Sequence, residues 1–367
     1  MKQEARRDHA KGGQDAINRV STEPLKQFTR YYPPEWERQK TAWLSWPHNE
    51  KEWGKDRLGK IREFYKELIS VILNFQDVHL IFPSEGLLHN NDFPVETLRT
   101  TSLKKIIIPN NDIWIRDYGP FFLEEGDRDA MNRVSTAGRT EFIVDFQFNA
   151  WGGKFPPWDL DNKVPKEIAL YYGMEIESYP LILEGGALEF SGDGVILTTE
   201  ECLLNKNRNK DITKEQIELV LKAAFNIEEI IWLKNGLVND HTDGHVDNVA
   251  RFIGPRKVLV CKQKNNENIN ILKTWRHFKE GSKLEIVEIP LPETSNIKLK
   301  DLPCSYANFI FVNGGIIVPI YNCRTDDVVL KTFQELFPGR KVIGIDCSLL
   351  IQEGGGIHCM TKQEPTF

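Results

Sequence analysis

Short β-branched segments recur along the whole chain and constrain its fold more than any other feature of the sequence. Each runs for about four to eight residues and ends at proline, glycine, asparagine or aspartate, which is typical of β-strands. The predicted strands lie at 77–83, 104–109, 140–146, 194–199, 256–261, 283–290, 308–320 and 340–346. Helical patterns lie between some of them, at 56–74, 213–226 and 325–338. This alternation predicts an α/β protein built of similar modules.

Local signals mark the ends of several predicted elements. Asp211 or Thr213 precedes the second helical pattern, and Thr325 is predicted to cap the third. Asn313 and Gly314 separate two apolar runs, which predicts a hairpin with a tight turn.

The overall charge and composition narrow the class of protein. The 367 residues are 40% hydrophobic and 27% charged, and their formal net charge is -6. Since there is no basic field, nucleic acid is not expected as a partner, and a cationic small molecule is mildly favoured. The first residues are charged, and no window approaches the roughly 18 apolar residues of a membrane span. We therefore expect no membrane association and a cytoplasmic location.

One large domain is predicted over residues 31–367, behind a poorly structured N-terminal extension at 1–30. No linker rich in glycine, proline or serine divides the chain. The octapeptide at 15–22 recurs with one change at 129–136. Such a repeat is too local for a structural module, so residues 127–139 are predicted to be a surface insert, where extra chain length costs little.

One cysteine stands apart from the other five. The six cysteines contain no CxxC pair, so metal-ligand spacing is absent, and a reducing compartment would keep them as thiols. Cys202, Cys261 and Cys347 lie in apolar or strand-like surroundings and are predicted to be small buried residues. Cys359, however, follows three glycines that end at Gly356, and glycines let a backbone approach a substrate closely. It is the candidate nucleophile.

Two polar stretches carry further candidates, each with a plainer alternative. Asp117 lies in Asn111–Pro120, where it is either a functional carboxylate or a surface turn residue. Glu184 precedes Gly185 and Gly186, which could also form a strand-ending turn in which glycine supplies a positive φ.

The stretch Asn239–Asn248 concentrates histidine and aspartate, with His241, Asp243, His245 and Asp247 at every second position. On an extended strand His245 and Asp247 would share one side. The stretch can be read as a plain loop, a metal site or a catalytic pair. Since paired cysteines and an HExxH helix are missing, the catalytic His245–Asp247 pair is favoured over the metal site.

These residues together indicate the substrate's charge. A thiol nucleophile needs a lowered pKa, a proton shuttle and groups that orient the electrophile. Carboxylates around a thiol repel its thiolate, which makes sense chiefly when the substrate is a cation. A guanidinium fits best because it is planar, always charged and bound by carboxylates through paired hydrogen bonds. A cysteine protease would instead need N–H donors for an oxyanion.

The motifs in this order closely resemble the agmatine deiminases, within the porphyromonas-type peptidylarginine deiminase superfamily of guanidine-modifying enzymes. They include "NDIWIRDYGP", "VDFQFNAWGGK", "LEGGALEFSGDG", "TTEECLLNKNRN", "NDHTDGHVDNVARF", "SYANFIFVNGGIIVPIYN" and "EGGGIHCMTKQEP". The resemblance covers nearly the whole chain beyond its first thirty or so residues and the predicted insert. It implies a pentein fold, a five-bladed pseudo-symmetric α/β propeller of ββαβ modules around one central site.

The resemblance also implies roles for particular residues. Cys359 is similar to the nucleophile and His245 to the general acid/base. Asp117 and Asp247 resemble the guanidinium ligands. Glu184 resembles a supporting carboxylate, and Trp114 a wall of the pocket. Gly356 belongs to the glycine run, which the resemblance implies brings the backbone close to the substrate. The same run delivers Cys359 to the propeller axis.

The implied reaction converts agmatine to N-carbamoylputrescine and ammonia through a covalent thiouronium on Cys359, with no metal or organic cofactor, and belongs to polyamine metabolism. Two alternatives stay open: a deiminase of peptidyl-arginine or another guanidine, and a non-catalytic protein that binds guanidines or polyamines. A homodimer is a family expectation. Asp243 and Lys362 depart from the family pattern. Asp243 adds a charge suited to the distal amine of agmatine, and Lys362 either lowers the thiol pKa or points outward.

Overall fold

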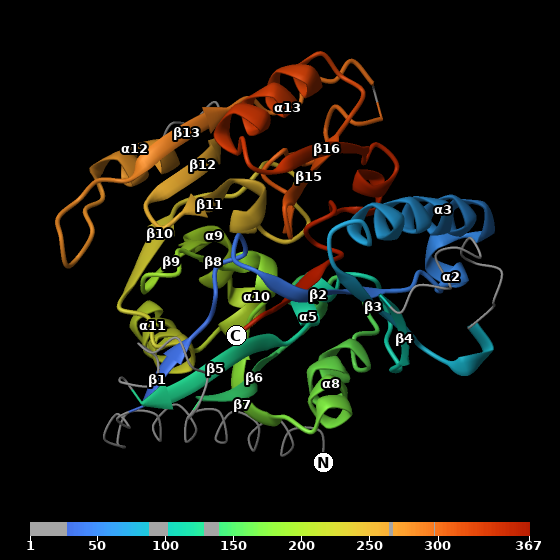
Figure 1. Ribbon diagram of the computed structural model, residues 1–367, viewed down its shortest axis with the longest axis horizontal. Helices are drawn as coiled ribbons and strands as arrows, with labels where there is room; N and C mark the ends of the chain where they lie inside the picture. The colour runs from blue at the N-terminus through green and yellow to red at the C-terminus, as the bar shows by residue number, and fades with distance from the viewer. Residues whose placement is uncertain (1–27, 88–101, 128–138, 264–266, 297) are drawn as a thin grey trace.

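Five small β-sheets organise the computed structural model, which describes residues 28–87, 102–127, 139–263, 267–296 and 298–367. In Figure 1 the sheets follow one another around the molecule in chain order, from β5–β7 at the lower left to β2–β4 at the right. The longer helices lie toward the outside in this view, and the C-terminal segment reaches the middle.

Each sheet repeats one pattern of strand pairing. In one of them, β14 (Ile310–Val312) runs antiparallel to β15 (Gly315–Ile320), and β15 runs parallel to β16 (Lys341–Asp346). Helix α13 (Thr325–Leu336) crosses between the two parallel strands, which cannot be joined by a tight turn. The unit is therefore a ββαβ module.

The other four sheets contain the same unit. One consists of β5 (Phe121–Asp127), β6 (Arg139–Gln147), α8 (Val164–Tyr172) and β7 (Glu175–Ile182), and the next of β8 (Glu189–Phe190), β9 (Val195–Thr199), α11 (Lys214–Phe225) and β10 (Glu229–Leu233). A third consists of β11 (Ala250–Gly254), β12 (Lys257–Cys261), α12 (Glu267–Thr274) and β13 (Glu285–Ile289). The last consists of β17 (Lys362–Pro365), β2 (Gln39–Ser45), α3 (Lys55–Ile72) and β3 (Asp77–Phe82). Strands β1 (Phe28–Tyr31) and β4 (Leu103–Ile107) extend two of the sheets to four strands. The predicted α/β class and its ββαβ modules are confirmed.

Short helices lie between these units and carry much of the site. The α-helical ones are α2 (Glu50–Trp53), α5 (Ile115–Tyr118), α7 (Ala150–Gly153), α9 (Glu200–Leu203) and α10 (Lys206–Asn209). The 3-10 helices are η1 (Glu85–Leu87), η2 (Asp161–Lys163), η3 (Gly185–Ala187), η4 (Val246–Asn248) and η5 (Leu350–Glu353).

The last strand of the chain and an early one, β2, meet in one module. β17 pairs antiparallel with β2, with Lys362 opposite Trp43, and the Trp43 indole N–H donates to Glu364 Oε2 at 2.9 Å. All four residues of β17 are buried, although chain termini are usually frayed. This pairing closes the series of modules and fixes the segment that carries Cys359.

The helices bury one apolar face each. In α3 the buried residues include Leu58, Ile61, Tyr65, Leu68 and Ile72, which recur at the three- and four-residue spacing of a helix face. They join a large hydrophobic cluster that also contains Trp43, Trp114 and Cys359. The site is therefore supported directly by the main core.

Most of the predicted elements are found at the predicted positions. Helix α11 begins with a capping box in which Thr213 accepts from the Gln216 backbone N–H. The expectation that Thr325 caps α13 was wrong: Thr325 is the first helical residue, and its hydroxyl instead accepts from the Glu293 backbone and contacts Tyr306. A tertiary contact took the place of the local cap.

Two predicted boundaries fall at the edge of the described residues. Of the expected N-terminal extension, residues 1–27 lie outside them, but 28–30 form part of β1, which pairs with β5, so the extension ends earlier than predicted. Of the predicted insert at 127–139, residues 128–138 lie outside them, and its two ends belong to β5 and β6. Within the described ranges, no helix has both the length and the apolar character needed to cross a membrane.

Candidate active site

Cys359 lines a cavity of about 340 Å³. Three aromatic side chains form part of its wall: Trp114, Trp151 and Phe155. Carboxyl side chains form another part, from Asp112, Asp117 and Glu353. The remaining lining residues are His241, Thr242, Gln352, Gly354 and Gly355. The cavity thus combines apolar walls with negative charge, a combination suited to an elongated organic cation.

The triple glycine before Cys359 is required by close packing. Gly354 ends η5 with φ +100°, a left-handed conformation that favours glycine. A Cβ on Gly355 would lie 2.4 Å from Trp114 Cζ3, and one on Gly356 would lie 2.3 Å from Asn308 Oδ1. No larger residue fits at either place, so the run lets the chain pass between two walls and present the thiol.

The Cys359 thiol is surrounded by both a donor and carboxylates. The Asn308 side-chain amide donates to Sγ at 3.2 Å, and Asp247 Oδ2 lies 3.9 Å from Sγ. Burial, together with the charges of Asp247 and Asp117, raises the pKa of the thiol well above its ordinary value, against the opposing effect of the Gly356 backbone and Asn308. The empty cavity therefore favours the thiol, and a bound cation would favour the thiolate.

Asp117 is held rigidly at the cavity wall by two hydrogen bonds. Its Oδ1 accepts from the Gly186 backbone N–H at 2.9 Å, and its Oδ2 accepts from the Trp151 indole N–H at 2.8 Å. Burial raises its pKa to about 6, and the negative charge of Asp247 acts in the same direction, while His245 opposes it. A pKa of about 6 leaves Asp117 mostly ionised at neutral pH, and a bound cation would favour the ionised form further.

Gly186 marks the point where the polar groups converge. A Cβ on this residue would lie 2.6 Å from His245 Nδ1, 2.8 Å from Asp117 Oδ1 and 3.0 Å from Asp247 Oδ2. The plainer alternative, in which Gly185 and Gly186 supply a positive φ to a turn, does not hold, since neither has one. Glycine is needed here because any side chain would collide with these three groups.

His245 and Asp247 are brought together by a turn. The prediction that they lie on one extended strand was wrong: His245 is the residue before η4, and Asp247 lies within it. The His245 backbone N–H donates to Thr242 Oγ1 at 3.1 Å, which fixes the turn.

The His245 ring is fully buried, with Nδ1 3.7 Å from Asp117 Oδ1. Burial alone would lower its pKa, but Asp117 and Asp247 outweigh it and raise the pKa well above the ordinary value. The ring is set up as a proton donor.

Asp247 belongs to a buried relay that the sequence did not reveal. His358 Nδ1 lies 2.7 Å from Asp247 Oδ2, and His358 Nε2 lies 2.9 Å from Glu35 Oε2. Both nitrogens can donate only in the imidazolium, so these contacts favour the charged ring, whereas burial and the Arg116 guanidinium act to lower its pKa. Burial alone would raise the pKa of Asp247, but the His358 hydrogen bond and charge lower it below the ordinary value.

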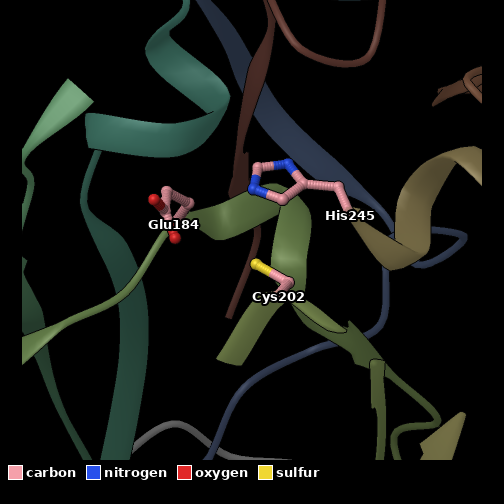
Figure 2. Close-up of side chains that lie close together, drawn as sticks. All are labelled: Glu184, Cys202 and His245. Carbon is pink, nitrogen blue, oxygen red and sulfur yellow. The ribbon is translucent and has the colours of Figure 1, made fainter. Parts of the chain in front are cut away.

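Glu184 lies behind the imidazole. Its Oε1 accepts from Arg208 Nε at 2.7 Å in a fully buried ion pair. Its carboxylate, the Cys202 sulfur and a His245 nitrogen lie within 4.8 Å of one another, as Figure 2 shows. The carboxylate is therefore placed to support the histidine.

The remaining predicted residues differ in their surroundings. Trp114 lines the cavity and stacks on Trp53. Asp243 does not line it; its two oxygens accept from Lys154 at 2.6 Å, from Asn207 at 2.8 Å and from Arg208. Those partners leave little of its charge for a distal amine.

Lys362 does not point outward. It is 1% exposed, its Nζ lies 3.7 Å from the centre of the Phe121 ring, and burial lowers its pKa well below the ordinary value. The charges that set the Cys359 pKa are those of Asp247 and Asp117. Lys362 therefore sits behind the site as a buried amine.

The sequence did not point to several residues that contact the predicted ones. They are Trp151, Asn308 and His358, together with Cys202, which was taken for a packing residue. Glu35, which the sequence also did not indicate, contacts His358. The only local signal was the position of His358 directly before the candidate nucleophile. The others become visible only when distant segments are brought together.

Five ββαβ modules around a buried cysteine, histidine and carboxylate site define the pentein class of α/β proteins. The model of one family within this class, the Porphyromonas-type peptidyl-arginine deiminases, matches residues 31–365. The chain belongs to this family.

Named relatives agree with this assignment and confirm the resemblance seen in the sequence. A C. jejuni agmatine deiminase carrying a cysteine-to-serine change, solved with substrate bound, is 32% identical with a TM-score of 0.79, and the match covers 94% of this chain and 99% of that one. The agmatine deiminase of Enterococcus faecalis is 29% identical with a TM-score of 0.81, covering 92% and 96%. A Legionella pneumophila protein that bears agmatine deiminase as a provisional name is 35% identical, covering 94% and 97%.

Proposed function

We propose that this chain hydrolyses agmatine to N-carbamoylputrescine and ammonia. The observation that carries the proposal is the convergence of Asp117, Asp247 and His245 around Gly186, next to the cavity that Cys359 and Asp117 line. A planar guanidinium at the inner end of this cavity would meet carboxylates, which bind it through charge-assisted hydrogen bonds. Cys359 Sγ lies 3.9 Å from Asp247 Oδ2 and so borders the same group of side chains.

The first half of the reaction breaks a carbon–nitrogen bond. As the cation binds, its charge favours the Cys359 thiolate and the thiol proton leaves to solvent. Sγ attacks the guanidinium carbon, and the His245 imidazolium gives its proton to the departing nitrogen, which leaves as ammonia. The enzyme then holds an S-alkylthiouronium on Cys359.

The second half restores the enzyme. The neutral His245 removes a proton from water, whose oxygen attacks the same carbon. The S–C bond breaks with its electrons returning to Cys359, the remaining hydroxyl proton passes to this thiolate, and the ureido product departs. Each residue thus ends in the state in which it began.

The cavity walls favour agmatine over arginine. Trp114, Trp151 and Phe155 suit a chain of methylene groups. The Asp112 carboxyl group suits a distal ammonium, whereas Glu353 already pairs with Arg57 at 2.6 Å. Among the described residues, no arginine or lysine lines the cavity, so the carboxylate of free arginine would have no cationic partner there. The C. jejuni relative was solved with substrate bound after one of its cysteines was changed to serine, which supports a cysteine at the reaction centre. A protein that only binds a guanidine would need no nucleophile.

Substrate choice can be tested by ammonia release. Agmatine, arginine and a blocked arginyl peptide are supplied at equal concentration, and agmatine should give by far the highest kcat/KM. Equal or faster release from the peptide would move the activity to peptidyl-arginine, and no release from any of the three would favour a protein that only binds guanidines.

The raised pKa of Asp117 predicts an acid limb in the pH profile. Since the carboxylate must be ionised to bind the guanidinium, kcat/KM should fall as the pH drops through about 6. A bound cation favours the ionised form, so the corresponding limb in kcat at saturating agmatine should move to lower pH. Identical limbs in the two profiles would show that Asp117 is not the titrating ligand.

A further inference from the structure

Three potential metal ligands converge on the side of His245 that faces Glu184. A nitrogen of His245, an oxygen of Glu184 and the sulfur of Cys202 all lie within 4.8 Å of one another. Figure 2 shows a ring nitrogen of His245 turned toward the Glu184 carboxylate, with the Cys202 sulfur pointing into the space between them. We call these three residues the His245 cluster.

Polar atoms of this cluster are buried without partners. All three residues are fully buried. Among the described residues, neither His245 Nε2 nor Glu184 Oε2 has a hydrogen-bond partner of normal geometry, whereas His245 Nδ1 lies 3.7 Å from Asp117 Oδ1 and the Cys202 sulfur helps to raise the pKa of the ring. Buried polar groups are nearly always paired in folded proteins, so unpaired atoms aimed at one space indicate a missing ligand. Arg208 neutralises Oε1 of Glu184 but leaves Oε2 available.

The supports of the cluster are independent and rigid. Cys202 lies on α9, where the Thr199 side chain accepts from its backbone N–H. Glu184 directly precedes η3, and His245 directly precedes η4. Three separate segments therefore hold the three side chains toward each other.

The donor types select among metal ions. One imidazole nitrogen, one sulfur and one carboxylate oxygen make the mixed set that Zn²⁺ accepts in tetrahedral sites, with a fourth position left open. Mg²⁺ and Ca²⁺ prefer oxygen ligands throughout. The chemistry of the set thus favours a borderline transition metal over the hard cations.

We propose that the His245 cluster reversibly binds a zinc ion that inhibits the enzyme. Binding forms bonds from the metal to the imidazole nitrogen, the thiolate and the carboxylate, and it releases the thiol proton and the imidazolium proton to solvent. Coordination occupies the imidazole that would carry the proton, so turnover stops. The inhibitory effect rests on the proposed function; the binding does not.

The binding is tested first by spectroscopy, without reference to activity. Co²⁺ alone is added to the full-length Cys359→Ala variant, in which the candidate nucleophile is absent. A thiolate-to-metal charge-transfer band should form and disappear on addition of Zn²⁺. The band should be lost in Cys202→Ser and kept in Cys261→Ser, a matched change at another buried cysteine. Circular dichroism confirms that each variant is folded.

Two results would overturn the site. No charge-transfer band in any folded variant would show that the cluster does not bind metal. A band that is lost in Cys359→Ala but survives Cys202→Ser would place the metal on the other thiol.

The inhibition is tested by ammonia release. Zn²⁺ should inhibit the unmodified enzyme, EDTA should restore full activity, and Cys202→Ser should raise the inhibitory zinc concentration by about tenfold or more. Each zinc titration is scaled to the variant's own metal-free rate, and an unchanged zinc sensitivity in Cys202→Ser would overturn the inhibitory role alone. If no guanidine is turned over at all, the proposed function fails while the Co²⁺ experiment still decides the site.

Discussion

Replacing Cys359 with serine should abolish ammonia release from agmatine while leaving the protein folded. A hydroxyl has nearly the same size as a thiol but is a far weaker nucleophile at neutral pH. Removal of a nucleophile typically costs about 10⁴-fold or more in turnover, and we expect a loss in that range. The measurement is ammonia release by the purified variant at saturating agmatine, over a long incubation.

The matched control is Cys261→Ser. Cys261 is equally buried, and its sulfur already contacts the Ser305 hydroxyl, so a hydroxyl should be accepted there. That variant should keep its turnover. If Cys359→Ser retained normal ammonia release while Cys261→Ser lost it, the assignment of the nucleophile would be wrong.

Asp117→Asn should lower kcat/KM for agmatine by about 1,000-fold. The amide keeps the shape of the carboxylate but loses the charge that binds the guanidinium and that grows in importance as the reaction proceeds in a closed site. Asparagine has one acceptor oxygen for the two N–H donors of Gly186 and Trp151, so one hydrogen bond is lost, but the protein should stay folded at pH 7 because removal of a buried charge offsets part of that loss. The folded-state pKa of about 6 lies above the ordinary value of an aspartate, so stability is lost as the pH rises from the ordinary pKa through about 6. Above that pH the ionised Asp117 carries the full cost, which asparagine removes.

Asp145→Asn provides the control for that change. Asp145 is also buried, burial likewise raises its pKa to about 6, and it hydrogen-bonds to Ser178 instead of lining the cavity. Its amide variant should keep normal kcat/KM. Steady-state kinetics and thermal melts of the two variants separate a lost ligand from a lost fold, and near-normal kcat/KM in Asp117→Asn would place the guanidinium elsewhere.

The two guanidinium ligands are electrostatically unequal. His358 keeps Asp247 ionised, with its pKa below the ordinary value, whereas burial raises that of Asp117. Carboxyl groups whose pKa values are pushed apart usually have different tasks. In the proposed mechanism, Asp247 stays an anion beside Cys359 down to a lower pH than Asp117, which is protonated as the pH falls through about 6.

Local sequence determined the elements of this protein. The hairpin at Asn313 and Gly314 and the helix that begins after Thr213 follow from turn and cap chemistry within a few residues. Residue types also indicated the chemistry, because a thiol among carboxylates is meaningful only with a cationic substrate. For the same reason Cys359, His245 and Asp117 could be selected without knowing where they lie in space.

Tertiary structure decided how those residues meet. The pairing of β17 with β2, the turn of His358 toward Asp247 and Glu35, and the place of Cys202 beside His245 all join segments far apart in the chain. Even the need for glycine at Gly186 comes from three side chains on other segments. Turns and caps depend on neighbours along the chain and can be predicted from them. A buried contact depends on which distant surfaces pack together, and no local pattern encodes it.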